Sequence, residues 1–158
     1  MGLYPPLIND ITTDYQNPPA FLFHAKEEPK RTWTYPQEQA KDQKKNYPEV
    51  QPLEGPSDMS ADQVFVVVLE VAREQKDWKI LFTDKDNRRI EGSAVTALLR
   101  FRDDFAIEVR TFAEGDIPAK TQVHMRSKSR LGRSDFGANS KRIVSFFAQV
   151  KKRFSQGN

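Results

Sequence analysis

The sequence predicts an α+β fold, in which a four-stranded antiparallel meander carries an N-terminal and a C-terminal helix on one face. An extended proline-rich arm precedes this α-β-β-β-β-α unit. Two observations indicate the division: nine of the ten prolines fall within residues 5–56, whereas residues 59–154 have the apolar periodicity of a folded domain. We therefore assign residues 1–56 to the arm and residues 57–158 to an α+β domain large enough to fold without disulfides.

The arm is predicted to be extended but partly ordered. Its prolines fix φ and push the preceding residues towards β or polyproline II conformations, so no long helix is expected there. The arm also has apolar residues that disordered tails lack, and we expect them to hold parts of it on the domain surface. These residues are Leu7, Ile8, Ile11, Phe21, Leu22, Phe23, Trp33, Tyr35 and Tyr47. The lysine-rich stretch 41–45 is expected to be the most mobile part.

The first helix of the domain is predicted over residues 61–75. Ser60 followed by Gln63 is a capping-box signature, and apolar residues then recur at helical spacing. The β-branched run 66–68 would favour a strand instead. The cap and the length of the periodic pattern favour the helix.

Alternating and β-branched segments between polar turns predict four strands. The strands are residues 78–83, 89–100, 105–110 and 121–127. Residues 84–87 and 114–118 are predicted turns, and Asp103-Asp104 is expected to mark the turn between the second and third strands. Sequential strands of this kind close most simply as an antiparallel meander.

The last helix has the clearest periodicity. Its apolar stripe consists of Ile143, Phe146, Phe147, Val150 and Phe154. With both helices on one face, the other face of the sheet would carry Glu108, Arg110, His124 and Arg126, unless the arm covers it.

Composition and charge limit the classes of function. The chain has no cysteine, which excludes disulfide and thiolate chemistry. No apolar run approaches the roughly 18 residues of a membrane span, and the start does not resemble a signal peptide. Residues 120–158 contain ten Lys and Arg against one acid, whereas the first 119 residues contain fifteen against twenty-one. The basic end could attract nucleic acid, anionic lipid or an acidic partner, or it could face the acidic remainder of its own domain.

The candidate site is the polar segment 126–142, between the fourth strand and the last helix. One interpretation is an anion site, in which a helix N-terminus and guanidinium groups bind a phosphate or carboxylate. Its ligand-binding residues would be Arg126, Ser127, Ser129, Arg130, Ser134, Asn139 and Arg142. The alternative is a structural network, in which Asp103, Asp104 and Asp135 occupy the arginines. Ser134 or Asp135 is expected to cap the last helix.

Other chemistries have weak signals. Asp103 and Asp104 could suggest a divalent metal ion, but adjacent residues on a strand would point to opposite faces. A turn or an arginine partner is favoured instead, and no metal site is predicted. His24 and His124 lack ligand spacing and are expected at the surface. No nucleophile elbow, phosphate loop or dinucleotide fingerprint occurs, so we predict no catalytic residue and no cofactor. Nucleic acid is an unlikely partner, because the basic segment lacks interleaved aromatic residues.

Several motifs are similar to those of a known family. They are Trp78, Ile90-Glu-Gly, Phe101-Arg-Asp-Asp104 and Arg126-Ser-x-Ser-Arg-x-Gly-x-Ser-Asp-x-Gly-x-Asn-x-x-Arg-Ile143. Together with the opening Pro5-Pro-Leu-Ile-Asn-Asp and Asn17-Pro-Pro, they resemble the bacterial and plastid family called domain of unknown function 1499. The resemblance supplies no reaction. It implies a location in the cell envelope or periplasm, because such members often carry N-terminal membrane segments or export signals; the alternative is the cytoplasm.

Our leading hypothesis is a non-enzymatic, envelope-associated domain that binds an anionic small molecule or a protein partner through segment 126–142. One alternative is an enzyme acting on a phosphorylated or carboxylated small molecule, with Asp103, Asp104 or Asp135 as its acid or base. Another is a purely structural subunit of an assembly. Ligand identity and oligomeric state stay open.

Overall fold

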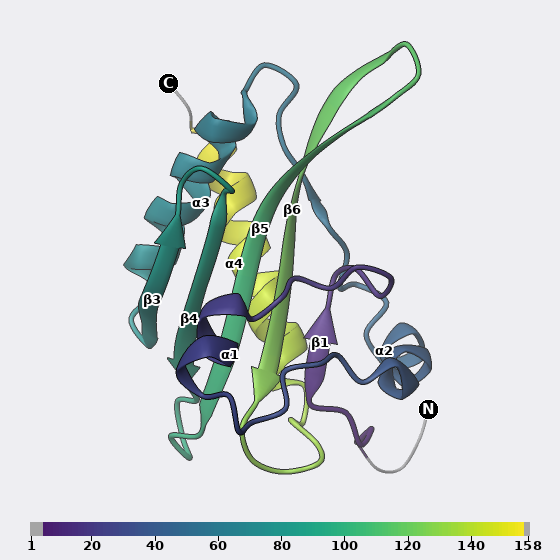
Figure 1. Cartoon of the computed structure of the whole chain (residues 1–158), viewed down its shortest axis with the longest axis vertical. Helices are drawn as coiled ribbons and strands as arrows, with labels where there is room; N and C mark the ends of the chain where they lie inside the picture. The colour runs from purple at the N-terminus through teal and green to yellow at the C-terminus, as the bar shows by residue number, and fades with distance from the viewer. Residues whose placement is uncertain (1–4, 157–158) are drawn as a thin grey trace.

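The computed structural model describes residues 5–156 and has an α+β fold built on one antiparallel sheet of six strands (Figure 1). The strand order is β1-β6-β5-β4-β3, and β2 also pairs with β6. Four strands run in sequence as the predicted meander: β3 (Trp78–Asp84), β4 (Arg89–Val95), β5 (Arg102–Glu114) and β6 (Ile117–Ser129). No helix within residues 5–156 is both long enough and apolar enough to cross a membrane.

The arm supplies the other two strands, so the prediction of four strands was incomplete. β1 (Asp10–Thr12) and β2 (Leu53–Glu54) both pair antiparallel with β6. Strands of three and two residues carry almost no periodic signal, which is why the sequence pattern did not reveal them. The division of the chain into an arm and a domain at residue 56 stays a prediction.

Short helices fill the rest of the arm: α1 (Leu22–Glu27), the 3-10 helix η1 (Gln37–Gln39) and α2 (Ala40–Asn46). The stretch 41–45, expected to be the most mobile, lies within α2. The buried side chain of Gln43 explains the order, because it accepts from the Thr12 N–H at 3.0 Å and donates to the Thr12 carbonyl at 2.8 Å. A side-chain amide thus satisfies the outer edge of β1 in place of another strand.

Helices α3 (Ala61–Glu74) and α4 (Ala138–Ser155) pack together behind the sheet in the view of Figure 1. The predicted capping box is present at α3: Ser60 Oγ accepts from the Gln63 N–H, and the Gln63 side chain accepts from the Ser60 N–H. The predicted apolar stripe of α4 faces the core, and Phe146 contacts Trp78 at a ring-centroid distance of 4.8 Å. Arm residues Ile8, Ile11 and Val50 are buried in the same core.

Several strand boundaries differ from the predictions. β4 ends at Val95 instead of residue 100, and Asp103 and Asp104 lie inside β5, paired with residues of β4 and β6, instead of forming a turn. β5 and β6 are longer than the predicted strands 105–110 and 121–127, so most of the predicted turn 114–118 lies within them. Two buried carboxylates are tolerated in a central strand because each has an arginine partner: Asp103 pairs with Arg142, and Asp104 pairs with Arg130. The turn is residues 96–101.

The other face of the sheet is covered by the arm, with α1 in front of β4 and β5 (Figure 1). Polar and charged side chains of the sheet therefore lie between two layers of the protein. Among them are Glu91, Asp104, Glu108, His124 and Arg126, all buried.

Candidate functional site

Arg126 is the largest fully buried side chain on the arm face, with 2% of its surface exposed. Its Nε and Nη2 donate to the two carboxylate oxygens of Asp10 at 2.9 and 2.8 Å. The remaining donors contact the carbonyls of Pro19 and Trp33. The guanidinium carbon lies 4.7 Å from the ring centre of Phe21. These partners all belong to the arm, so Arg126 fixes the arm to β6.

Arg130, one residue past the end of β6, lies on the same face four residues after Arg126. It donates to both oxygens of Asp104, with Nε at 2.8 Å from Oδ2, and to both oxygens of Glu28 at the end of α1. Since two carboxylates already bind this guanidinium, its donors are engaged on both sides. The two carboxylates raise the pKa of Arg130 further above its already high value.

His24 of α1 lies between two buried carboxylates, contrary to its expected surface position. Its Nδ1 is 2.8 Å from Glu91 Oε1, and its Nε2 is 3.1 Å from Asp104 Oδ1. Burial lowers the pKa of His24, but Asp104 and Glu91 outweigh that effect and raise it above its ordinary value. Burial raises the pKa of Asp104, but His24 and Arg130 outweigh it, so this pKa ends below its usual range.

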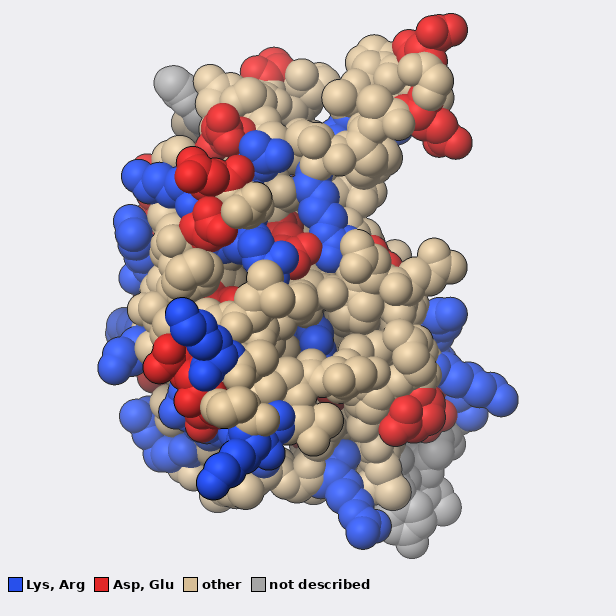
Figure 2. Space-filling view, in the orientation of Figure 1, with Lys and Arg blue, Asp and Glu red and all other residues tan. Residues whose placement is uncertain are grey.

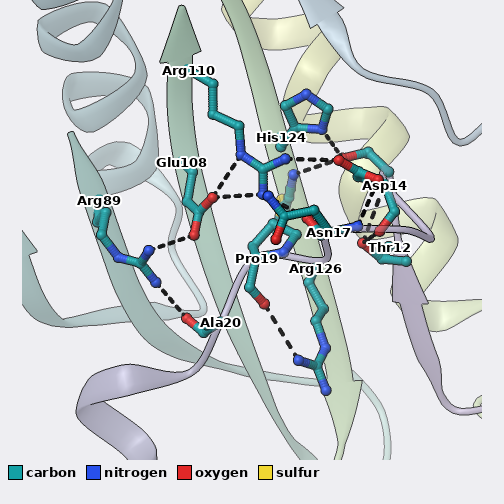
Figure 3. Close-up of polar contacts among 12 residues, drawn as sticks. Thr12, Asp14, Asn17, Pro19, Ala20, Arg89, Glu108, Arg110, His124 and Arg126 are labelled. Carbon is teal, nitrogen blue, oxygen red and sulfur yellow. Dashed lines mark hydrogen bonds and ion pairs between the residues drawn. The ribbon is translucent and has the colours of Figure 1, made fainter. Parts of the chain in front are cut away.

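A third group of charges lies higher on the same face (Figure 3). Glu108 of β5 binds Arg89 at 2.6 Å and Arg110 at 2.7 Å. Arg110 continues to the arm, where it donates to Asp14 at 2.8 Å and to the Asn17 carbonyl at 2.7 Å. His124 is also buried here, against the expectation of a surface histidine. Burial and the nearby Arg110 lower its pKa to about 4.

On the helix face, Arg142 of α4 binds Asp103 of β5, with Nη2 2.8 Å from Oδ2. Its Nη1 donates to Ser127 Oγ at 3.1 Å and to Asn139 Oδ1 at 2.8 Å. The Asn139 amide donates to Ser129 Oγ at 2.8 Å and to Asp135 Oδ2 at 2.9 Å. These side chains form one buried network that ties β5, β6 and α4 together.

The N-cap residue of α4 is Gly137, not the predicted Ser134 or Asp135, but Asp135 binds N–H groups at the helix start. Its carboxylate accepts from the N–H groups of Gly137 and Asn139 at 2.8 and 3.3 Å. Ser134 instead accepts from the Phe136 N–H, outside the helix. Most of the polar side chains of segment 126–142 therefore form contacts within the protein. The assignment of these residues as ligand-binding stays a prediction.

A cavity of about 410 Å³ lies beside this network, at the end of the sheet. It is bordered by two loops, residues 96–101 between β4 and β5 and residues 130–137 between β6 and α4, which we call the loop pair. Leu98, Leu99, Phe101, Leu131 and Phe136 line it and are all exposed. Asp103 and Asp135, both buried, also line it. This volume lies within the range of small-ligand sites, which are mostly apolar with a few polar groups.

The loop pair is held in defined conformations. Residues 96–101 are closed by hydrogen bonds between Thr96 and Phe101, and Arg100 has φ 57°. Phe136 has φ 53°. A non-glycine residue in this region costs about 1–3 kcal/mol, which the surrounding hydrogen bonds must offset. The loops therefore present their leucine and phenylalanine side chains to water from an ordered backbone.

Asp103 is the titratable group with the most unusual surroundings in the cavity. Burial raises its pKa, and the opposite effect of Arg142 does not offset this. Although Arg142 lies within ion-pair distance of Oδ2, that oxygen accepts no well-aligned hydrogen bond within residues 5–156. In the same part of the chain, no group of three His, Asp or Glu side chains is arranged to hold a metal ion.

Sequence reasoning missed three arm residues and one residue of β4 that complete the site. Asp10 and Glu28 of the arm pair with Arg126 and Arg130. His24 of the arm lies between Asp104 and Glu91 of β4. Asp10 is 116 residues from Arg126, so no local pattern connects them. The surplus of acids in the first 119 residues was the available signal, because the basic end does face that acidic remainder.

The fold and the site define a class of protein: an α+β domain whose sheet is covered by helices on one face and by an ion-paired arm on the other. A family model described as "Protein of unknown function (DUF1499)" matches residues 10–150, which is most of the chain. The chain belongs to this family. None of the curated proteins compared with it matches.

Proposed function

We propose that this chain is a non-enzymatic binding domain of the cell envelope, and that it binds its partner through the loop pair, whose second loop lies within segment 126–142. The observation that carries the proposal is the apolar cavity with five large exposed side chains around it: Leu98, Leu99, Phe101, Leu131 and Phe136. Monomeric proteins rarely expose contiguous apolar surface of this kind unless it is a binding site. The envelope location follows the implication of the family resemblance.

The arrangement favours an apolar partner over an anion bound by the arginines. Arg126, Arg130 and Arg142 each already bind a carboxylate at 2.8 Å. An anionic ligand at any of them would have to displace that carboxylate and leave it buried without its partner, at a cost of several kcal/mol. The three arginines of segment 126–142 therefore support the loops, and the loops make the contact.

The proposal is tested with the uncharged fluorescent apolar probe Nile red. Leu131→Ser and Phe136→Ser should each weaken probe binding by about tenfold, since a buried side chain of this size contributes about 1.5–3 kcal/mol. Phe112→Ser and Ile117→Ser are matched controls, because these exposed apolar residues lie near the tip of the β5–β6 hairpin, away from the loops. Equal weakening by the control variants would contradict the proposal.

One observation favours an enzyme as a second candidate: the buried carboxyl of Asp103 lines the cavity and has a raised pKa. Such a group could act as an acid or base on a small phosphorylated or carboxylated molecule. Nuclear magnetic resonance titration of the Asp103 side chain tests this candidate. A midpoint in the ordinary range of an exposed aspartate would remove its basis, as would turnover of a phosphate ester by Asp103→Asn at the rate of the unchanged chain.

A further inference from the structure

The most exposed apolar side chains of the loop pair lie at its tips. Leu98 is 90% exposed, Phe136 81%, Leu131 68% and Leu99 65%. Single exposed leucines are ordinary, but four residues of this size on two neighbouring loops form a patch. Both loops lie at the lower end of the sheet in Figure 1, and the β5–β6 hairpin projects from the opposite end.

The exposed charged residues on and directly flanking the two loops are positive, although the exposed acid Asp77 lies near Arg100. Within residues 96–103 and 130–141, the acids are Asp103 and Asp135, and both are buried. The exposed charged residues of the same ranges are Arg100, Arg102, Arg133 and Lys141. The ion pairs of Arg100 with Asp77 and of Arg102 with Asp104 are long, at 3.7 and 3.6 Å. Figure 2 shows Lys and Arg atoms, and no Asp or Glu atoms, along the lowest edge of the face in view.

The loops are also fixed to the body of the domain, so their tips keep one spacing. The Asn9 amide donates to the Gly132 carbonyl at 2.6 Å, and the Asp135 N–H donates to the Ile8 carbonyl. In the other loop, the Thr96 N–H donates to the Phe101 carbonyl at 2.8 Å. The apolar tips and the cations therefore form one surface, and little conformational freedom is lost when this surface binds a partner.

We propose that the partner of the loop pair is the anionic surface of a lipid bilayer. Leucine and phenylalanine tips enter the boundary between headgroups and acyl chains, while the surrounding cations contact lipid phosphates. The charge complementarity favours this surface over an apolar protein segment, because an apolar segment needs no ring of cations. This inference rests on the proposed function, because it names the partner that binds the apolar site proposed there.

The experiment is vesicle flotation of the full chain with phosphatidylcholine vesicles that contain or lack phosphatidylglycerol. We expect flotation with the anionic vesicles, weakened by salt because exposed charges are screened. The double variant Arg133→Gln/Lys141→Gln should weaken binding roughly thirtyfold, from about one kcal/mol per cation near the membrane. Leu98→Ser/Leu131→Ser should weaken it by at least about tenfold.

Two control variants make the same kinds of substitution at positions away from the loop pair. Lys151→Gln/Lys152→Gln removes the same charge from the other end of α4, and Phe112→Ser/Ile117→Ser removes apolar side chains near the hairpin tip. Both should float like the unchanged chain. Failure of the unchanged chain to float, or equal losses in the controls, would overturn the bilayer proposal.

The fluorescent probe separates this inference from the proposed function. A chain that binds the probe through Leu131 and Phe136 but does not float refutes the bilayer and leaves an apolar protein segment as the occupant. A chain that binds neither probe nor vesicles refutes both proposals. Circular dichroism of each variant verifies that the substitutions leave the fold unchanged.

Discussion

The two faces of the sheet are covered by different chemistry. Behind the sheet, α3 and α4 bury an apolar core that includes Phe105, Phe146 and Ile143. In front of it, the arm buries Arg126, Asp104 and Glu91, each below 3% exposed, against carboxylates, a histidine and backbone carbonyls. The helix face is stabilised mainly by removal of apolar surface from water, with the Arg142–Asp103 pair as a local exception, whereas the arm face depends on every buried charge having its partner.

This difference predicts that the apolar core tolerates substitution better than the ion pairs of the arm face. An apolar core accepts other side chains of similar volume at modest cost. A buried ion pair has a strong attraction offset by a large desolvation cost, so loss of one partner leaves an uncompensated charge. The arm face is therefore fragile to single changes even though its net contribution to stability is not large. The predictions below test this contrast, from the largest expected effect to the smallest.

Removal of residues 1–56 should have the largest effect. The shortened chain would lose Ile8, Ile11 and Val50 from the core and leave the charges of β5 and β6 exposed. It should also expose the outer edge of β6, which β1 and β2 cover. We expect no cooperative thermal transition by circular dichroism. A cooperative transition of the fragment 57–158 would show instead that the arm is an accessory to an independent domain.

Arg126→Ala on the arm face and Phe146→Ala on the helix face should cost similar amounts. Each is expected to lower the free energy of unfolding by about 3–5 kcal/mol, the first through an unpaired buried Asp10 and the second through a cavity. Urea denaturation measures both. Hydrogen exchange separates them, because Arg126→Ala should first raise exchange in β1 and α1.

Two further variants control this pair. Arg153→Ala removes a surface ion pair with Glu74 and should change the free energy of unfolding far less than either of these substitutions. Asp10→Leu/Arg126→Met replaces both charges by apolar groups and should recover much of the stability lost in Arg126→Ala. If the double variant were as unstable as Arg126→Ala, the loss would come from packing against Phe21 and Tyr35 and not from an unpaired charge.

The same contrast explains how far the sequence could predict the structure. The stripe from Ile143 to Phe154 and the capping box at Ser60 are local patterns, and they gave α4 and α3 nearly to their ends. Leu98 and Leu99 continued an apolar run and were assigned to a strand, although they lie on an exposed loop. Apolar residues that serve a surface cannot be told from core residues by periodicity alone.

The candidate segment could be predicted because it is a local pattern, but the residues that pair with it could not be predicted. A dense run of polar groups between two apolar elements is visible in the sequence at residues 126–142. Which carboxylate meets which arginine depends on tertiary contacts between residues far apart, such as Glu28 and Arg130, separated by 102 positions. Composition could indicate only that acids were available.

The two buried histidines of the arm face should give opposite dependences on pH. The pKa of His24 is raised in the folded chain, so its stabilising contribution is complete below the unfolded value of about 6.5 and is lost as pH rises through the folded pKa. His24→Gln should therefore remove stability at pH 5 and little at high pH. Urea denaturation across the pH range checks this, and an equal loss at every pH would contradict it.

His124 should act in the other direction. Its folded pKa of about 4 lies below the unfolded value, so the unfolded chain takes up a proton first and stability falls as pH drops from about 6.5 towards 4. His124→Gln should flatten this acid loss. Asp104, whose pKa is lowered, adds a loss at still more acidic pH as it protonates. If both glutamine variants changed the pH dependence of stability in the same direction, the opposite roles assigned to His24 and His124 would be wrong.

The smallest expected effect comes from a local contact at the start of α3. Ser60→Ala removes the hydroxyl that accepts from the Gln63 N–H at 3.1 Å, and it should lower the free energy of unfolding by about 1 kcal/mol. Ser57→Ala, an exposed serine outside the helix, is the matched control and should have no measurable effect. Water can replace the lost hydroxyl at an exposed cap but cannot reach the buried Asp10. If Ser60→Ala cost as much as Arg126→Ala, burial of the unpaired group would not be the cause of the large loss on the arm face.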